Sequence, residues 1–184
     1  VASTYIIQKY NPSTPSREWE LLFDSSAYLY FILYDEANSA TVGRKWSATF
    51  PVSGWHLIAV TFNGATTTAT AEDGISIWVD GVEVDNTNIA QNSYTDMQNT
   101  SSDIIIGAGI NAGGSYIGWL KANITPLNIS RGIIPQSVIS AEYARGLTAI
   151  NSGSDLLTSD AVLRVKTDPL GKYVGVLNAS RLEV

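Results

Sequence analysis

The hydrophobic pattern of the chain centres on residues 55–62, with the sequence WHLIAVTF. Successive side chains of a β-strand point to opposite faces, so Leu57 and Ala59 share one face while Ile58 and Val60 share the other. Both faces are mostly apolar, a pattern typical of a strand that is covered on its two sides. The stretch therefore predicts a buried central strand, as in the middle of a β-sandwich.

Shorter runs before this stretch predict further strands, separated by turns rich in Pro, Asp and Ser. They are residues 1–10, 18–23, 28–34 and 41–50. In the third run, tyrosines at 28, 30 and 34 alternate with Leu29, Phe31 and Leu33. This alternation predicts an aromatic outer row and an apolar inner row.

After the central stretch, residues 75–84 predict a hairpin around Asp80-Gly81, a turn in which Gly81 needs a positive φ. Polar segments at 63–74 and 85–102 predict loops. Residues 103–107 predict a short buried strand, 116–129 one or two strands, and 161–166 and 173–177 two strand-like runs. The expected helix covers residues 133–145, with Pro135 near its start and Gly146 as its stop.

Many short strands with frequent turns and one late helix predict an all-β fold, an antiparallel two-sheet jelly-roll sandwich with one short helix in the C-terminal half. A chain of 184 residues suits one domain. We expect residues 1–150 to form the sandwich. Residues 151–184 would add strands that close the same sandwich or pack on a neighbour.

The amino-acid composition argues against several classes of function. The net charge of −6 and the absence of basic runs argue against nucleic acid, whose non-specific binding rests on Lys and Arg. No apolar run approaches the length of a membrane-spanning helix, so no membrane insertion is expected. The chain has no cysteine, which excludes disulfides and thiolate metal sites. It begins at Val1 without a signal peptide, which suggests a processed N-terminus or a piece of a longer protein.

The order and spacing of five motifs suggest a family. They are WHLIAVTF at 55–62, ISIWVDG at 75–81, IIIG at 104–107, IGWL at 117–120 and SAEY at 140–143. In this order they resemble the laminin G-like and pentraxin-like domains of the concanavalin A-like lectin/glucanase superfamily. The resemblance implies a jelly-roll fold and a non-catalytic recognition or adhesion module.

A search for catalytic groups gives no candidate. Glycosidases need paired carboxylates, and the E-x-D-x-x-E pattern of hydrolases in the superfamily is absent. Glu18 and Glu20 share one strand face, but a solvated edge strand is the favoured interpretation. His56 is the single histidine and lies in the central strand motif, where a structural role is favoured. No catalytic residue is predicted, and the chain is not expected to be an enzyme.

Calcium is the one cofactor considered, because rim loops with hard oxygen ligands suit it. The resemblance to pentraxins implies acidic and amide ligands just after the IIIG strand. Here only Asn111 could serve at that place. A site of another geometry would use Asp35, Asn38 or Asp103.

Aromatic side chains could stack on sugars, and the candidates are Trp46, Tyr94, Tyr116 and Trp119. The combined set of predicted ligand-binding residues is Asp35, Asn38, Trp46, Asn111 and Tyr116.

Three functions remain open from the sequence. The first is a recognition module for a glycan or protein surface, part of a larger secreted, cell-surface or virion protein. The second is a structural decoration or fibre component of a phage or virus particle, packed against other domains or copies. The third, less favoured, is a polysaccharide hydrolase or lyase. Fold alone does not decide among them.

Overall fold

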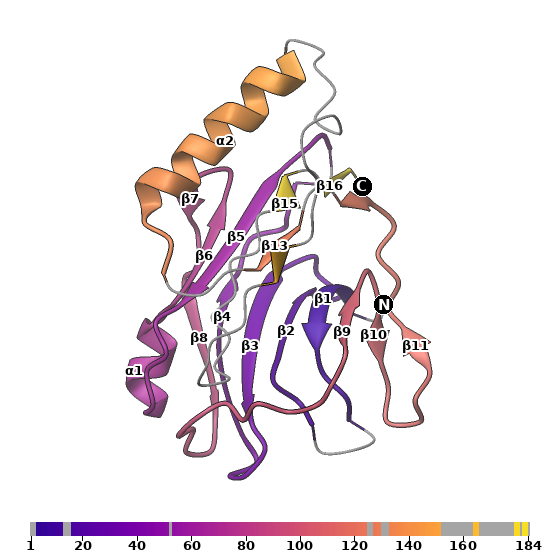
Figure 1. Ribbon diagram of the computed structural model, residues 1–184, viewed down its shortest axis with the longest axis vertical. Helices are drawn as coiled ribbons and strands as arrows, with labels where there is room; N and C mark the ends of the chain where they lie inside the picture. The colour runs from indigo at the N-terminus through magenta and orange to yellow at the C-terminus, as the bar shows by residue number, and fades with distance from the viewer. Residues whose placement is uncertain are drawn as a thin grey trace. The chain divides into compact units, whose positions relative to one another are not determined.

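The computed structural model describes residues 3–12, 16–51, 53–124, 127–129, 133–151, 164–165, 179–180 and 182–183 (Figure 1). Its strands are mostly antiparallel, so the predicted all-β fold class is confirmed. The chain divides into two compact units. The first comprises Val1–Pro51, Gly64–Ile75 and Asp85–Lys121, and the second comprises Val52–Asn63, Ser76–Val84 and Ala122–Val184. The predicted boundary at residue 150 stays untested.

The first unit is built on a six-stranded antiparallel sheet in the order β8-β4-β3-β2-β1-β9. Its strands are β1 (Thr4–Lys9), β2 (Trp19–Phe23), β3 (Leu29–Asp35), β4 (Ala40–Trp46), β8 (Thr87–Gln91) and β9 (Ile104–Ile106). The four strands predicted before residue 51 are therefore present.

One face of this sheet forms an apolar core. Cross-strand partners such as Leu21 and Phe31 lie opposite each other and are buried. Leu29 and Leu33 extend the same row, as the alternation predicted. Tyr34 departs from the predicted aromatic outer row because it is buried, and the reason lies in its hydrogen bond to a neighbouring strand, described below.

Two predicted loops contain regular structure. The segment 63–74 includes helix α1 (Thr68–Asp73), whose Ala71 is fully buried. The segment 85–102 includes β8, which pairs with β4 along its length. The loop predictions were wrong at these places because edge strands and short helices carry few buried side chains, so their periodicity is weak.

The strands β10 (Gly109–Ile110) and β11 (Tyr116–Ile117) form a small antiparallel hairpin that follows β9. The ring of Tyr5 lies against Gly109 and Gly118, where an added Cβ would come within 3.0 Å of ring atoms. The Tyr5 N–H also donates to the Gly118 carbonyl at 3.0 Å. The absence of side chains at these two glycines therefore lets the hairpin rest on β1. A strand is present at Ile104–Ile106, but none of its residues is buried and Ile106 is exposed, so the prediction of a buried strand at 103–107 was wrong about its burial.

The second unit contains a four-stranded sheet in the order β15-β5-β6-β7. Its strands are β5 (Leu57–Phe62), β6 (Ile75–Val79), β7 (Val82–Glu83) and β15 (Ala179–Ser180). Every residue of β5 is buried, which confirms the central strand. Two short pairs complete the unit: β12 (Asn123–Ile124) with β16 (Leu182–Glu183), antiparallel, and β13 (Asn128–Ile129) with β14 (Arg164–Val165), parallel. β14 falls within the strand predicted at 161–166, and the run at 173–177 lies outside the described residues.

Helix α2 (Gln136–Asn151) packs on the four-stranded sheet through Ile139, which is buried with Leu57, Ala59 and Trp78. It begins three residues later than predicted and continues past Gly146, because a glycine inside a helix costs only about 1 kcal/mol. Neither of the described helices is long and apolar enough to cross a membrane.

The β6–β7 hairpin confirms the predicted turn, with φ of 54° at Asp80 and 79° at Gly81. The Asp80 carboxylate accepts the Leu57 N–H at 3.0 Å and contacts His56 Nδ1 at 2.8 Å. His56 therefore has the structural role that was favoured for it.

Replacing Gly81 tests the turn. An alanine Cβ there would make only ordinary contacts, with Tyr143 at 3.5 Å, so the cost comes from the backbone. We expect Gly81→Ala to lower the free energy of unfolding by about 1–2 kcal/mol. Gly146→Ala is the matched control: it lies in a helix with open space around it, and we expect it to raise stability by about 0.5–1 kcal/mol. Denaturant unfolding measures both, and equal effects would contradict the assignment of the turn.

Candidate functional site

An exposed aromatic pair stands on the β10–β11 hairpin. The side chains of Tyr116 and Trp119 are 56% and 62% exposed, and their ring centroids lie 5.9 Å apart at an interplanar angle of 50°. Neither ring is needed for the core, since both remain largely in solvent. Adjacent exposed rings of this size are typical of binding surfaces rather than of ordinary surface residues.

The loop of the hairpin is held by Asn111. Its Oδ1 accepts the N–H groups of Gly113 and Ser115 at 2.9 and 3.0 Å, and its own N–H donates to the Ser115 carbonyl. Such side-chain turns fix short loops. The predicted ligand residue Asn111 thus uses its amide oxygen to shape the loop that precedes Tyr116.

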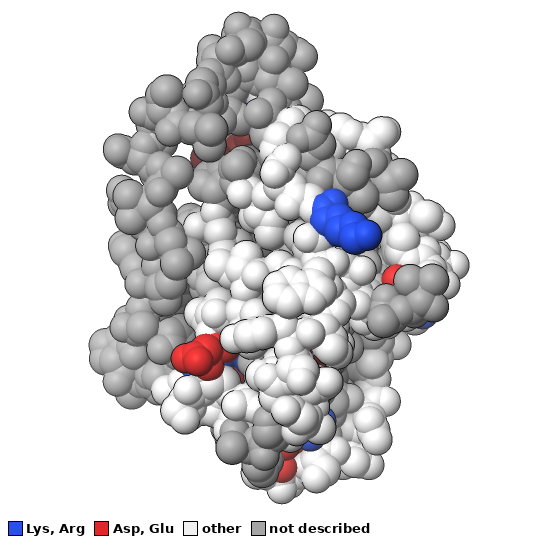
Figure 2. All heavy atoms as spheres, turned by 90° about the vertical axis from the view of Figure 1, so that its right-hand side faces the viewer, with Lys and Arg blue, Asp and Glu red and all other residues white. Residues whose placement is uncertain are grey.

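The segment that carries the pair has no charged side chain from residue 104 to residue 120, and the exposed Lys121 follows Trp119 by two positions. Figure 2 shows the side of the molecule on which β9, β10 and β11 lie in Figure 1, and most of the described surface there carries neither Lys and Arg nor Asp and Glu. Ile106 on β9 adds another exposed apolar side chain to the same unit. An uncharged surface with exposed rings can stack on neutral ligands that present flat apolar faces.

Two other aromatic candidates serve packing. Trp46 is half-buried and meets Phe50 edge-on at 6.1 Å, and Phe50 in turn packs on Phe23. Tyr94 is 2% exposed, so its prediction as a stacking residue was wrong. Its N–H donates to Thr68, which ties the segment after β8 to α1.

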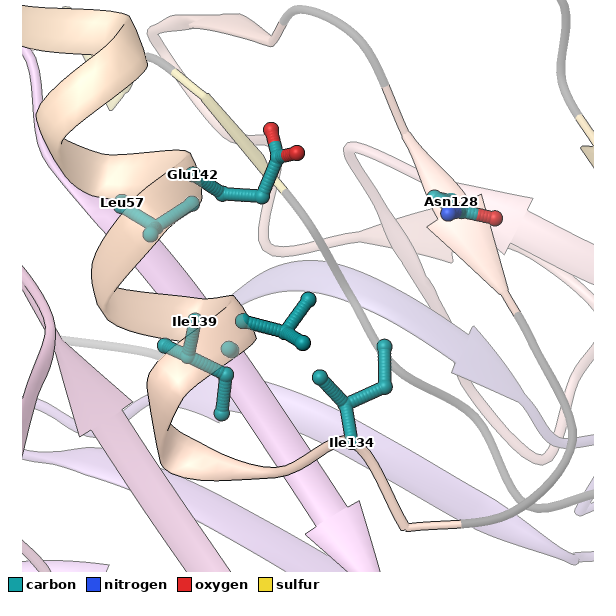
Figure 3. A pocket seen from close by; sticks show the side chains of 7 residues that line it. Leu57, Asn128, Ile134, Ile139 and Glu142 are labelled. Atoms are coloured by element: carbon teal, nitrogen blue, oxygen red, sulfur yellow. The ribbon is translucent and has the colours of Figure 1, made fainter.

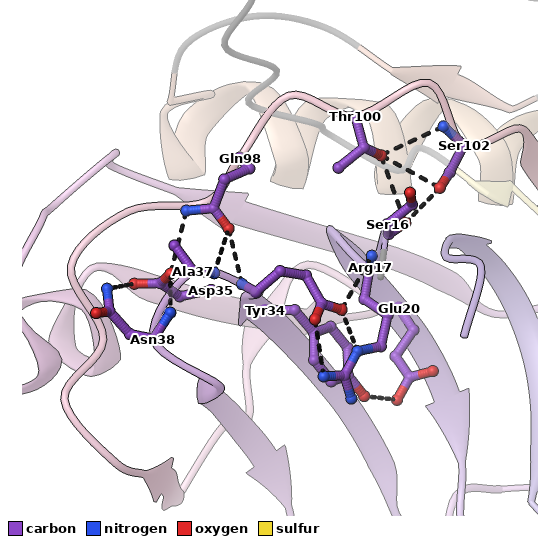
Figure 4. Close-up of polar contacts among 11 residues, drawn as sticks. Ser16, Arg17, Glu20, Tyr34, Asp35, Ala37, Asn38, Gln98, Thr100 and Ser102 are labelled. Carbon is purple, nitrogen blue, oxygen red and sulfur yellow. Dashed lines mark hydrogen bonds and ion pairs between the residues drawn. The ribbon is translucent and has the colours of Figure 1, made fainter. Parts of the chain in front are cut away.

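The predicted ligand residues Asp35 and Asn38 lie together in a hydrogen-bond network at the end of β3 (Figure 4). The Asp35 carboxylate is fully buried. It accepts from the N–H and Nδ2 of Asn38, the N–H and Oγ1 of Thr95, the N–H of Asp96 and the Nε2 of Gln98. Burial acts to raise the pKa of Asp35, but these hydrogen bonds outweigh it and hold the pKa below its usual value.

This network bears on the predicted calcium site. A cation at Asp35 would have to displace donors that already occupy both carboxylate oxygens. Asp103 is exposed. Within the described residues, no group of three or more His, Asp or Glu side chains could hold a metal ion. Calcium binding stays a prediction, and Asp35 has a structural role without it.

A second polar cluster lies on the face of the six-stranded sheet opposite its apolar core. Glu20 is 6% exposed and accepts the Tyr34 hydroxyl at 2.5 Å. The Arg17 guanidinium lies 5.0 Å from the centre of the Tyr34 ring and forms a two-point ion pair with Glu36 (Figure 4). The interpretation of Glu18 and Glu20 as residues of a solvated edge strand was therefore wrong, because β2 lies between β1 and β3.

Burial dominates the chemistry of Glu20 and raises its pKa to about 7, against the Tyr34 hydrogen bond and the Arg17 charge, which lower it. Gln8, its cross-strand partner on β1, is fully buried, and neither polar atom of its side-chain amide has a partner among the described residues. No pattern in the sequence indicates this burial, since charged residues alternating with apolar ones usually indicate a solvated face.

A small pocket lies under α2 in the second unit (Figure 3). It is lined mainly by apolar side chains from β5 and α2, with Asn128 and Glu142 as its polar members, and its volume is about 100 Å³. Pockets for drug-sized ligands begin at about 300 Å³, so this one is too small for a sugar ring with its contacts.

Comparison with known families gives one match. The family model described as the concanavalin A-like lectin/glucanases superfamily matches residues 2–130, a range that includes β1 to β13. Neither a curated protein nor a solved structure matches the chain. The match confirms the resemblance and, together with the antiparallel sheets, the fold class. The description names both lectins and glucanases, so the match alone does not decide between binding and catalysis.

Replacing Asp35 tests its structural role. In Asp35→Asn one carboxylate oxygen becomes an amide nitrogen that faces hydrogen-bond donors, so we expect a loss of about 3 kcal/mol in the free energy of unfolding. Asp103→Asn is the control, and as an exposed substitution it should change stability by less than about 0.5 kcal/mol. An Asp35→Asn protein as stable as the control would refute the network's role.

The raised pKa of Glu20 predicts a dependence of stability on pH. Because the folded protein holds this proton more tightly, the contribution of Glu20 is complete below the ordinary glutamate pKa of 4.5 and is lost as the pH rises through about 7. With the pKa raised from 4.5 to about 7, at about 1.4 kcal/mol per unit of pKa, the loss is about 3–4 kcal/mol. The difference in the free energy of unfolding between Glu20→Gln and the wild type should therefore shift in favour of Glu20→Gln by that amount between about pH 4 and about pH 8. A difference in melting behaviour that is constant with pH would contradict the prediction.

Proposed function

The chain belongs to the concanavalin A-like lectin/glucanases superfamily, and from this premise we propose that it is a non-catalytic recognition module that binds glycan through Tyr116 and Trp119. The exposed pair is the observation that carries the proposal. The backbone that carries the two rings is restrained, because Gly109 and Gly118 rest on Tyr5, so less backbone freedom is lost when a ligand binds.

The surroundings of the pair favour a glycan of low charge. Few charged side chains appear on the face shown in Figure 2, and residues 104–120, which include both rings, contain no charged side chain. The two carboxylates nearest to a glycosidase pattern are engaged in structure: Glu18 is paired with Lys9, and Glu20 with Tyr34. This supports recognition over hydrolysis. The module would form part of a larger secreted, cell-surface or virion protein.

The test is a glycan array followed by titration calorimetry of the best neutral glycan. Truncating an aromatic residue at the centre of an interface commonly costs about 1–2 kcal/mol or more, so Trp119→Ala and Tyr116→Ala should each weaken binding about tenfold. Trp119→Phe keeps a ring and should retain most of the affinity.

Val82→Ala is the matched control, because Val82 is equally exposed but lies in the second unit. It should leave the affinity unchanged. An array without signal, or binding that survives the loss of both rings, would refute the proposal. A protein partner captured through the same two rings would redirect it to protein recognition.

A further inference from the structure

A lysine, a carboxylate and an asparagine meet beside β1 in the first unit. The Nζ of Lys9 lies 2.6 Å from Glu18 Oε1 and 3.4 Å from Asn99 Oδ1, and it also donates to the Thr100 carbonyl at 3.1 Å. The side chain of Lys9 is 9% exposed and that of Glu18 is 0% exposed. Asn99 lies 90 positions further along the chain and is itself exposed.

The three groups match the requirements of amide-bond formation between side chains. An amine can attack the carbon of a primary amide when it is held beside that carbon and a neighbouring acid moves the protons. We propose that Lys9 and Asn99 form an intramolecular isopeptide bond, with Glu18 as the proton carrier. The proposal is independent of glycan binding.

The reaction balances without any co-reactant. Nζ gives a proton to Glu18, and its freed lone pair attacks Cγ of Asn99, with negative charge gathering on Oδ1. Glu18 returns the proton to Nδ2, which leaves as ammonia when the C–Nδ2 bond breaks. The second proton that Nζ loses as it becomes an amide nitrogen passes through Glu18 to this ammonia, which becomes ammonium. The products are a secondary amide between Lys9 and Asn99 and one ammonium ion, formed from the lysine ammonium and the asparagine amide.

The surroundings position Glu18 for this task. Its Oε1 accepts the N–H and hydroxyl of Thr100 at 2.5 and 2.7 Å, which fixes the carboxylate next to Nζ. Its Oε2 is buried and has no hydrogen-bond partner in the described part of the chain, so it is available to carry a proton. Moving a proton from Lys9 to Glu18 replaces two charges by neutral groups, and burial of these two side chains favours that exchange. The exposure of Asn99 gives the ammonia a way out.

Intact mass spectrometry of the full chain after folding tests the proposal. We expect the wild-type mass to fall below the sequence mass by one ammonia molecule, and a protease digest to contain a linked peptide that joins Lys9 to Asn99. Glu18→Gln, Lys9→Arg and Asn99→Ala should each keep the full mass expected from their sequences. Lys45→Arg is the matched control and should still lose ammonia, because Lys45 lies over the rings of Tyr28 and Tyr30.

Each other outcome overturns the proposal. Wild-type protein that melts cooperatively and shows the full sequence mass would refute it directly, whatever the variants do. A loss of ammonia that persists in Lys9→Arg would mean that Asn99 cyclises on its own backbone instead. A loss of ammonia that persists in Glu18→Gln would remove the role of Glu18.

Discussion

Buried carboxylates need hydrogen-bond donors, and the first unit supplies them from one long polar segment. Glu18 immediately precedes β2 and Asp35 ends β3, and because these strands are antiparallel the two residues lie at the same end of the pair, both fully buried. Thr95 and Gln98 donate to Asp35, while Thr100 donates to Glu18. An unpaired buried carboxylate would cost several kcal/mol, so these contacts fix the segment between β8 and β9 onto the sheet. The abundance of Asn, Ser, Thr and Gln in this segment therefore has a physical explanation, since such residues can donate hydrogen bonds to the buried carboxylates.

The parts of the fold that the sequence predicted are those where a local pattern decides the structure. The strand β5 has apolar residues on both faces, and the turn at Gly81 needs a backbone conformation that few residues accept. The strand β8 and the helix α1 escaped prediction because their order comes from pairing with β4 and from one buried side chain, Ala71. Neither kind of contact produces a periodic pattern of hydrophobic residues in the sequence.

The candidate site residues show the same difference between what a local pattern predicts and what contacts between strands decide. Tyr116 and Trp119 were both recognisable as stacking candidates from the sequence. Their exposure could not be predicted, since tryptophan is more often packed in a core. The burial of Glu20 depends on Tyr34, a partner fourteen positions away whose own outward orientation had been inferred from alternation. Contacts between strands decide such cases, and a single sequence does not reveal them.

Both proposed sites depend on residues of the strand β1. Tyr5, near its start, carries the hairpin with the aromatic pair, and Lys9, at its end, is held by Glu18 and Asn99. Because β1 lies between β2 and β9, displacing it would disturb both the seat of the hairpin and the ion pair. A covalent bond at Lys9 would restrict that displacement in a chain that has no cysteine for a disulfide. The rigidity that favours binding at Tyr116 and Trp119 would then rest on chemistry at the opposite end of the same strand.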